Sequence, residues 1–154
     1  MNNLTIRTVN FNTDMPDILI MDRYINGERM YGLVMHEYKN YKGMIYVAEI
    51  NGEIAGYVSF LQHHLHHVAM IDHMAVKEHH RRKGIGTQLI KHVTQEATKK
   101  HNRILAVQIA LWNYAAIQFY KVNGFTMRAV LPGISGTNSD MIGLDKDLIQ
   151  ENPV

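Results

Sequence analysis

The sequence predicts a mixed α/β domain, antiparallel in its first half and built from strand–helix–strand units in its second half. Three observations lead to this class. Short runs rich in β-branched residues come early, an Asn-Gly pair at 51–52 joins two of them, and later runs are separated by helical apolar stripes. Because 154 residues suit one domain, we take residues 1–154 as a single domain.

Local patterns define each element in chain order. Strands are placed where apolar and β-branched residues alternate or run together, and helices where apolar residues recur at three- or four-residue spacing. Gly, Asn and Pro mark the turns between them. The predicted order is strand 4–9, a helix that begins after Asn12–Asp14, a helix at 24–41 that ends at Gly43, strands 44–50, 53–61 and 68–76, helix 86–101, strand 104–111, helix 114–122, and strands 125–130 and 140–148.

Composition excludes several classes of protein. The chain has no Cys, which excludes disulfide scaffolds, thiolate zinc sites and cysteine nucleophiles. No apolar run reaches the roughly 18 residues that a membrane span needs. The first residues lack the basic and apolar regions of a signal peptide. We therefore expect a cytoplasmic protein with no membrane partner.

Positive charge is concentrated in one segment. The net charge is only +2, but residues 77–103 hold eight bases and two acids. This segment is expected to lie near an anion. The small overall charge argues against a nucleic acid as the main partner.

The turn between strand 68–76 and helix 86–101 has the composition of an anion-binding loop. Gly84 and Gly86 let backbone amides approach an anion without a Cβ in the way, and the helix N-terminus adds unpaired N–H donors. Three bases supply charge, namely Arg81, Arg82 and Lys83. Together these features suit a pyrophosphate, although a plain glycine turn with solvated charges stays open.

Two other phosphate-binding motifs do not fit this turn. A Walker A loop requires Lys and then Ser or Thr after its last glycine, whereas Thr87 and Gln88 follow Gly86. A dinucleotide fingerprint requires a third glycine where the chain has Leu89.

Two motifs resemble those of the GNAT family of N-acetyltransferases. Arg81-x-x-Gly84-x-Gly86 is similar to the family's Gln/Arg-x-x-Gly-x-Gly/Ala, and Met74-Ala75-Val76 to its apolar-Ala-Val strand end. The run from Asn113 to Phe125 is similar to the family's Asn-x-x-Ala-x-x-x-Tyr-x-x-x-Gly-Phe. Both stand in register within a matching strand–helix order, and the resemblance covers residues 4–148.

The resemblance implies a fold and a co-substrate. The fold is a central mixed, mostly antiparallel sheet of about seven strands with about four helices, splayed between strands 4 and 5. The co-substrate is acetyl-CoA, and no metal is expected. The residues implied in binding it are Met74, Ala75 and Val76 along the pantetheine arm, Arg81, Arg82, Lys83, Gly84, Ile85, Gly86 and Thr87 around the pyrophosphate, and Asn113 on the CoA arm.

The expected chemistry is direct attack of a primary amine on the thioester. Tyr120, at the family's Tyr position, is the candidate general acid for the departing thiolate. Asp72 is the favoured base that accepts the amine proton. Asp72 and His73 are consecutive strand residues that face opposite sides, so at most one of them can face the acceptor. His73 or a water chain stays open as the base.

The acceptor is expected to be a small-molecule amine or an amine of a peptide or protein. Residues 12–43 are slightly acidic and aromatic, and as a wall of the acceptor site they would favour a cationic amine. An ordinary solvated helix face stays open for this segment. Two alternatives stay open: an acyl-CoA-binding regulatory module without turnover, and a toxin-like acetyltransferase acting on aminoacyl-tRNA. Members of the family are often dimers, which leaves a homodimer open.

The histidines form two clusters. His63–His67 falls at an expected turn, where a solvated loop fits better than a metal site because consecutive side chains diverge. His79 and His80 are expected to meet solvent or the CoA phosphates.

Overall fold

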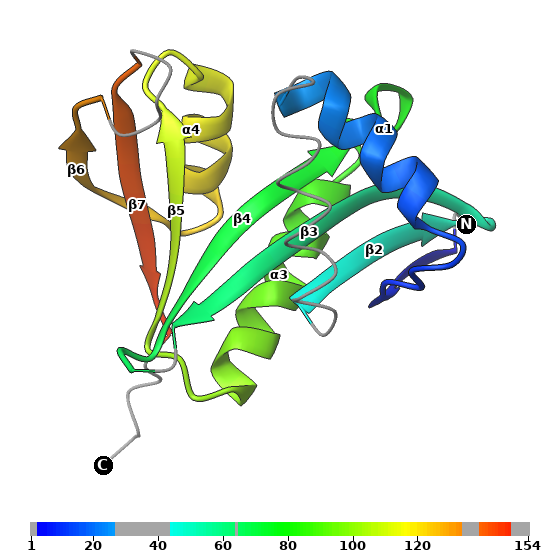
Figure 1. The fold of residues 1–154 in the computed structure, drawn as a ribbon, viewed down its shortest axis with the longest axis horizontal. Helices are drawn as coiled ribbons and strands as arrows, with labels where there is room; N and C mark the ends of the chain where they lie inside the picture. Colours follow the sequence, from blue (N-terminus) through cyan, green and yellow to red (C-terminus); the bar gives the residue numbers. More distant parts are fainter. Residues whose placement is uncertain (1–2, 27–43, 64, 134–138, 149–154) are drawn as a thin grey trace. The chain divides into compact units, whose positions relative to one another are not determined.

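The computed structural model describes residues 3–26, 44–63, 65–133 and 139–148. These ranges hold seven strands, three α-helices and one short 3-10 helix (Figure 1). In chain order they are β1 (Leu4–Thr8), α1 (Met15–Asn26), β2 (Ile45–Ile50), β3 (Glu53–His63), β4 (Val68–Val76), η3 (Glu78–His80), α3 (Ile85–Lys99), β5 (Ile104–Ala110), α4 (Tyr114–Val122), β6 (Thr126–Leu131) and β7 (Met141–Asp147). No helix in these ranges is long and apolar enough to cross a membrane.

The strands form a seven-stranded, mostly antiparallel sheet in the order β1-β2-β3-β4-β5-β7-β6. β4 and β5 are the parallel pair, and their ladder joins Val68–Ile71 to Ile104–Val107. Each strand is longer than this ladder, since β4 runs to Val76 and β5 to Ala110. The predicted mixed α/β class is therefore confirmed. The order β5-β7-β6 was not predicted, because it depends on pairing between distant segments.

The helix count differs from the expected four, since the described residues hold three α-helices. Most of the expected helix at 24–41 lies outside the described residues, and residues 24–26 are the end of α1. The predicted helix 86–101 ends at Lys99 instead. His101 adopts a positive φ of 61°, and the Asn102 side chain donates to the Ala97 carbonyl (3.1 Å), which terminates the helix.

The chain divides into two compact units, which are described separately. The first comprises residues 1–61 and 73–93, and the second residues 62–72 and 94–154.

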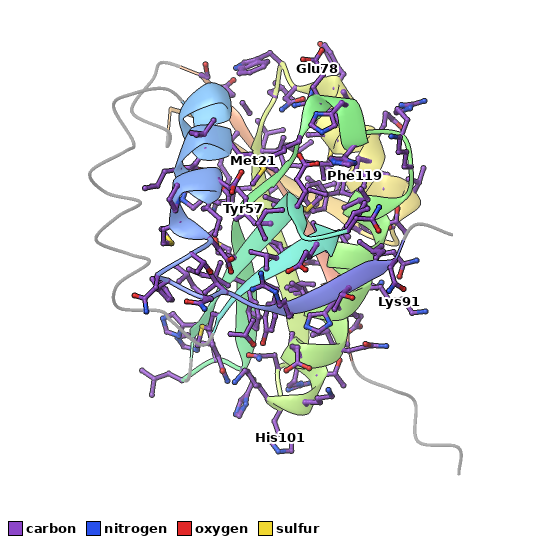
Figure 2. The ribbon with its side chains drawn as sticks, turned by 90° about the vertical axis from the view of Figure 1, so that its right-hand side faces the viewer. Met21, Tyr57, Glu78, Lys91, His101 and Phe119 are labelled. Atoms are coloured by element: carbon purple, nitrogen blue, oxygen red, sulfur yellow. The ribbon has the colours of Figure 1, made fainter. Side chains whose placement is uncertain are left out.

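In the first unit, α1 and α3 lie on opposite faces of β2 and β3 (Figure 1). Met21 of α1 and Tyr57 of β3 both belong to the core on the α1 side (Figure 2). The other buried members of this core are Val9, Met15, Ile18, Ile45, Val47, Ile54 and Ala75. On the α3 side, the predicted stripe is buried at Leu89, Ile90 and Val93. Both faces of the sheet are thus covered here.

The end of β4 packs closely against β3, the strand that follows the β2–β3 hairpin turn. Asn51 and Gly52 have φ values of 50° and 83°, as the predicted two-residue hairpin turn requires. A Cβ on Gly56 would lie 2.8 Å from the Ala75 carbonyl oxygen and 3.2 Å from Val76 Cγ2. A glycine is therefore needed at residue 56 for β3 to approach β4 this closely.

In the second unit, α4 has the predicted bounds exactly. The Asn113 side chain accepts a hydrogen bond from the Ala116 N–H (3.2 Å) and caps the helix. Gly124 follows the helix end with a φ of 89°, the left-handed conformation that glycine adopts most readily.

Candidate functional site

The end of β4 leads straight into the predicted anion-binding turn. Ala75 is buried, while Met74 and Val76 are half-buried. The Lys77 N–H donates to the Ala55 carbonyl (2.9 Å), which extends the contact of this strand with β3. The backbone of β4 is therefore anchored up to the residue before η3.

The turn itself adopts an unusual backbone. Arg82 and Gly84 have φ values of 60° and 80°. A Cβ on Gly84 would meet no atom within 4 Å, so the glycine is needed for its conformation and not for space. A positive φ is costly for a non-glycine residue such as Arg82, and such strain is typical of functional loops.

Two of the three basic side chains fold back on this turn. The Arg81 Nε–H donates to the Val76 carbonyl (3.0 Å), and the Lys83 ammonium donates to the His79 carbonyl (2.9 Å). Both residues and Arg82 are exposed. Their charges thus remain at the surface beside the start of α3.

The start of α3 offers backbone donors. The Gln88 N–H donates to the Gly84 carbonyl (3.0 Å), which is the first hydrogen bond of the helical i to i−4 pattern. The N–H groups of residues 85–87 come before this bond and have no partner of the same pattern. Gly84, which precedes the helix, has no side chain that could cap them. Such a helix start attracts anions through its donors and its dipole.

A pocket of about 260 Å³ opens beside this turn in the first unit. Its apolar lining residues are Ile20, Met21 and Val76, and its polar lining residues are Lys77, Glu78, His79 and Arg81. The exposed side chain of Glu78 lies in the short helix before the turn (Figure 2).

Tyr120, the candidate acid, lies inside the second unit. Its ring packs edge-on against Phe119 and Phe125, at centroid distances of 5.2 and 5.1 Å. Burial raises the pKa of its phenol above the ordinary value of 10. The phenol therefore keeps its proton at neutral pH, as a general acid must.

Asn113, the other candidate in this unit, uses its amide oxygen to cap α4. The amide NH₂ group and the second lone pair of that oxygen would be left for the contact predicted with the CoA arm.

The two candidate bases differ in their surroundings. Asp72 is exposed and His73 is buried, as expected for consecutive residues of a strand. His73 Nδ1 lies 3.5 Å from Asp22 Oδ1, and the Tyr57 hydroxyl donates to the same oxygen at 2.5 Å. The His73 N–H also donates to Ser59 Oγ (3.2 Å). This buried Asp22–Tyr57–His73 group could not be predicted from the sequence, because its members are far apart in the chain.

Of the acidic wall expected in residues 12–43, residues 27–43 lie outside the described residues, and the three acids described in the rest each have a partner. The buried Asp14 carboxylate pairs with Arg7 (2.7 Å), and Asp17 pairs with Lys77 (2.8 Å). Asp22 is buried beside Tyr57 and His73. These three carboxylates are engaged inside the unit and do not form a free anionic surface.

His79 is exposed to solvent, as expected, but the sequence did not reveal the partner that His79 and His80 share. Each ring places Nε2 3.2 Å from a different oxygen of the Glu53 carboxylate. The proximity of Glu53 was not visible in the sequence, because it lies 26 residues from His79. In the other cluster, the His63 and His66 rings stack at a centroid distance of 4.6 Å.

Comparison with known proteins gives the family. Residues 13–125 match the model of the acetyltransferase (GNAT) family. A protein of Methanocaldococcus jannaschii described as an uncharacterized N-acetyltransferase is 33% identical over 93 residues, which are 57% of this chain and 41% of that protein. The match thus covers less than half of that relative.

Solved structures share the fold at low sequence identity. Ard1 from Thermoplasma volcanium is 20% identical with a TM-score of 0.85, covering 96% of this chain and 99% of that one. The yncA protein of Salmonella typhimurium, solved with acetyl-CoA, is 22% identical with a TM-score of 0.78, covering 99% and 98%. The ribosomal-protein-S18-alanine N-acetyltransferase of Escherichia coli is 20% identical with a TM-score of 0.78, covering 98% and 99%.

The chain therefore belongs to the acetyltransferase (GNAT) family. This is a family of N-acetyltransferases whose co-substrate is acetyl-CoA, which confirms the resemblance seen in the two sequence motifs.

Proposed function

We propose that this chain transfers the acetyl group of acetyl-CoA to a primary amine by direct attack in a ternary complex. The observation that carries the proposal is the joint between β4 and α3. An anchored strand end, a turn with two positive φ values and an uncapped helix start lie in succession there, beside three basic side chains.

Each part of this joint has a role toward the donor. The backbone of Met74 and Val76 would pair with the pantetheine arm, next to the buried Ala75. The N–H groups from Arg82 through Thr87 would hold the pyrophosphate. Arg81 already donates to the Val76 carbonyl, so an N–H of the arm would either share that oxygen, which can accept two hydrogen bonds, or displace the Arg81 side chain.

The reaction needs two proton transfers. The amine nitrogen attacks the thioester carbon, and an N–H of the backbone near residues 74–76 would stabilise the oxyanion. The base removes the amine proton. When the C–S bond breaks, the Tyr120 phenol gives its proton to the CoA sulfur, giving the acetylated amine and free CoA.

Asp72 is proposed as the base, because it is an exposed carboxylate on the strand that leads to the donor turn. The rival is His73, whose Nδ1 lies close to the Asp22 carboxylate. A carboxylate behind an imidazole orients the ring and stabilises its protonated form. Asp72→Asn and His73→Gln separate the two, because the variant that has lost the base should lose kcat most at neutral pH and recover as a rising pH deprotonates the amine.

The acceptor is proposed as a primary amine of a small molecule, peptide or protein. Among structures with this fold are an enzyme for spermidine from Vibrio cholerae, in chimeric form, and the S18-alanine enzyme of Escherichia coli. Because Asp14, Asp17 and Asp22 are engaged inside the first unit, they give no reason to prefer a polycation.

Turnover tests the proposal directly. Release of the CoA thiol is followed with a panel of polyamines, amino acids and peptides with free N-termini, and the lack of Cys in the protein keeps the thiol readout clean. Release that requires an amine and is lost in Tyr120→Phe supports the proposal. Tight CoA binding without turnover on any amine would favour an acyl-CoA-binding regulatory module instead.

A further inference from the structure

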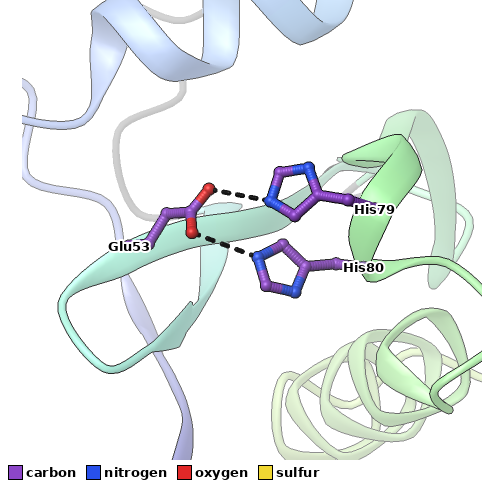
Figure 3. Close-up of side chains that lie close together, drawn as sticks. All are labelled: Glu53, His79 and His80. Carbon is purple, nitrogen blue, oxygen red and sulfur yellow. Dashed lines mark hydrogen bonds and ion pairs between the residues drawn. The ribbon is translucent and has the colours of Figure 1, made fainter.

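A cluster of side chains that could ligate a metal ion lies beside the Arg81–Gly84 turn. Glu53 begins β3 after the hairpin turn, and His79 and His80 belong to η3. One ligand atom from each of the three side chains lies within 4.8 Å of the others (Figure 3). We propose that Glu53, His79 and His80 bind a divalent transition-metal ion, with Zn²⁺ as the best fit.

The distances suit such an ion. His79 Nε2 lies 3.2 Å from Glu53 Oε1, and His80 Nε2 lies 3.2 Å from Glu53 Oε2. Ligands about 2.0–2.1 Å from a tetrahedral Zn²⁺ are about 3.3–3.4 Å apart. An ion could therefore replace the shared protons with small side-chain shifts. Water would complete the coordination, as in sites with three protein ligands.

The donor types favour zinc over magnesium or calcium. Two imidazoles and one carboxylate form a set that transition metals prefer, whereas Mg²⁺ and Ca²⁺ prefer oxygen alone. Glu53 is exposed, and such a carboxyl group is ionised at neutral pH. Nδ1 of His80 is buried without a hydrogen-bond partner among the described residues, which leaves Nε2 as the ligand nitrogen.

Lys77 would compete with a metal ion for the Glu53 carboxylate. Its ammonium lies 3.2 Å from Glu53 Oε1 and 2.8 Å from Asp17 Oδ1. When an ion binds Glu53, Lys77 can keep the shorter pair with Asp17. The competing charge therefore has another partner close at hand.

The backbone holds the ligands in place before an ion arrives. The His80 N–H donates to the Lys77 carbonyl (2.9 Å), and the Lys77 N–H donates to the Ala55 carbonyl (2.9 Å). η3 is thus tied to the strand that carries Glu53. A bound ion would link the β2–β3 hairpin to the segment that enters the Arg81–Gly84 turn, and it would raise the thermal stability of the folded protein.

Calorimetric titration of ZnCl₂ into EDTA-treated, desalted protein tests the proposal, with MgCl₂ as the control ion and no acetyl-CoA present. We expect one Zn²⁺ per chain and no comparable binding of Mg²⁺. Glu53→Gln and His79→Gln should each weaken Zn²⁺ binding by at least about tenfold. His66→Gln, a matched change at an exposed histidine outside the cluster, should leave it unchanged.

Three results would overturn the proposal: no Zn²⁺ binding by folded wild-type protein, wild-type affinity in both cluster variants, or loss of binding in His66→Gln. Circular dichroism checks that each variant folds. His79 is 63% exposed, so His79→Gln keeps the test decisive if Glu53→Gln fails to fold. The titration needs neither acetyl-CoA nor an amine, so its outcome is independent of the proposed acetyl transfer.

Discussion

Two strand-to-helix turns carry the family's motifs, and they differ in whether a side chain caps the first N–H groups of the helix. α4 begins after Asn113, whose side chain accepts the Ala116 N–H and so satisfies a helix donor internally. α3 begins after Gly84, which has no side chain, in a turn with positive φ at Arg82 and Gly84. A capped start is part of the fold, whereas an uncapped start beside exposed bases can bind an anion.

The largest expected effect comes from placing a negative charge at the uncapped start. Gly86→Glu introduces a side chain and a carboxylate where the pyrophosphate should lie, so we expect acetyl-CoA affinity to fall by more than about 100-fold. Titration calorimetry measures it. Gln88→Glu places the same charge at an exposed position later in α3 and should have a much smaller effect. Equal losses in both variants would mean that general charge repulsion, and not the helix start, controls binding.

The second test concerns Tyr120 in the capped helix. Tyr120→Phe keeps the packing against Phe119 and Phe125 but removes the proton donor, so kcat should fall by more than about tenfold while KM for acetyl-CoA stays constant. Tyr114→Phe is the matched control, since Tyr114 is an exposed tyrosine of the same helix. Unchanged kcat in Tyr120→Phe would exclude the general-acid role.

The third test uses pH at the turn that leads into α1. Burial raises the pKa of Asp14, but hydrogen bonds from Arg7, the Asn10 N–H and Thr13 outweigh burial and hold it below the ordinary value of 3.8. A carboxyl with a lowered pKa stabilises the fold above its unfolded pKa, and this contribution is lost as the pH falls below about 4. Asp14→Asn should therefore lower the free energy of unfolding by about 2 kcal/mol at pH 7.

The same variant should differ less from wild type at pH 3, because the Asp14 carboxyl of the unfolded chain is protonated there in larger part, whereas its lowered pKa keeps the folded carboxyl charged to lower pH. Urea unfolding at both pH values gives the comparison. A difference that stays equal at pH 7 and pH 3 would show that the charge of Asp14 does not contribute.

The smallest effect is expected at the Asn113 cap. Asn113→Ala should cost about 1 kcal/mol in urea unfolding, whereas Asn113→Asp retains a capping oxygen and should cost less. If Asn113→Ala leaves stability unchanged and only weakens acetyl-CoA binding, the contrast between the two helix starts does not hold.

Local patterns predicted most elements of this fold. The bounds of β4 and α4 agree exactly, and the Asn51-Gly52 hairpin has the expected positive φ values. These features depend on neighbouring residues, so one sequence is enough to predict them. The family match over residues 13–125 includes the motif that begins at Arg81.

Features that depend on distant contacts could not be predicted. Tyr57 and Asp22 are 35 residues apart, and no periodicity links them. In the sequence Glu53 is an ordinary charged residue after a hairpin turn. The folded hairpin and η3 together bring it close to His79 and His80. The need for a glycine at residue 56 likewise comes from the close approach of Ala75 in β4, which the sequence of β3 alone does not indicate.

Calorimetric titration of acetyl-CoA and CoA into the purified protein tests the central claim most directly. We predict micromolar binding of both at one site per chain, because the turn before α3 would recognise the pyrophosphate that they share. Absence of binding to well-folded protein would contradict it, and the glycine turn would then be a structural turn without a donor site.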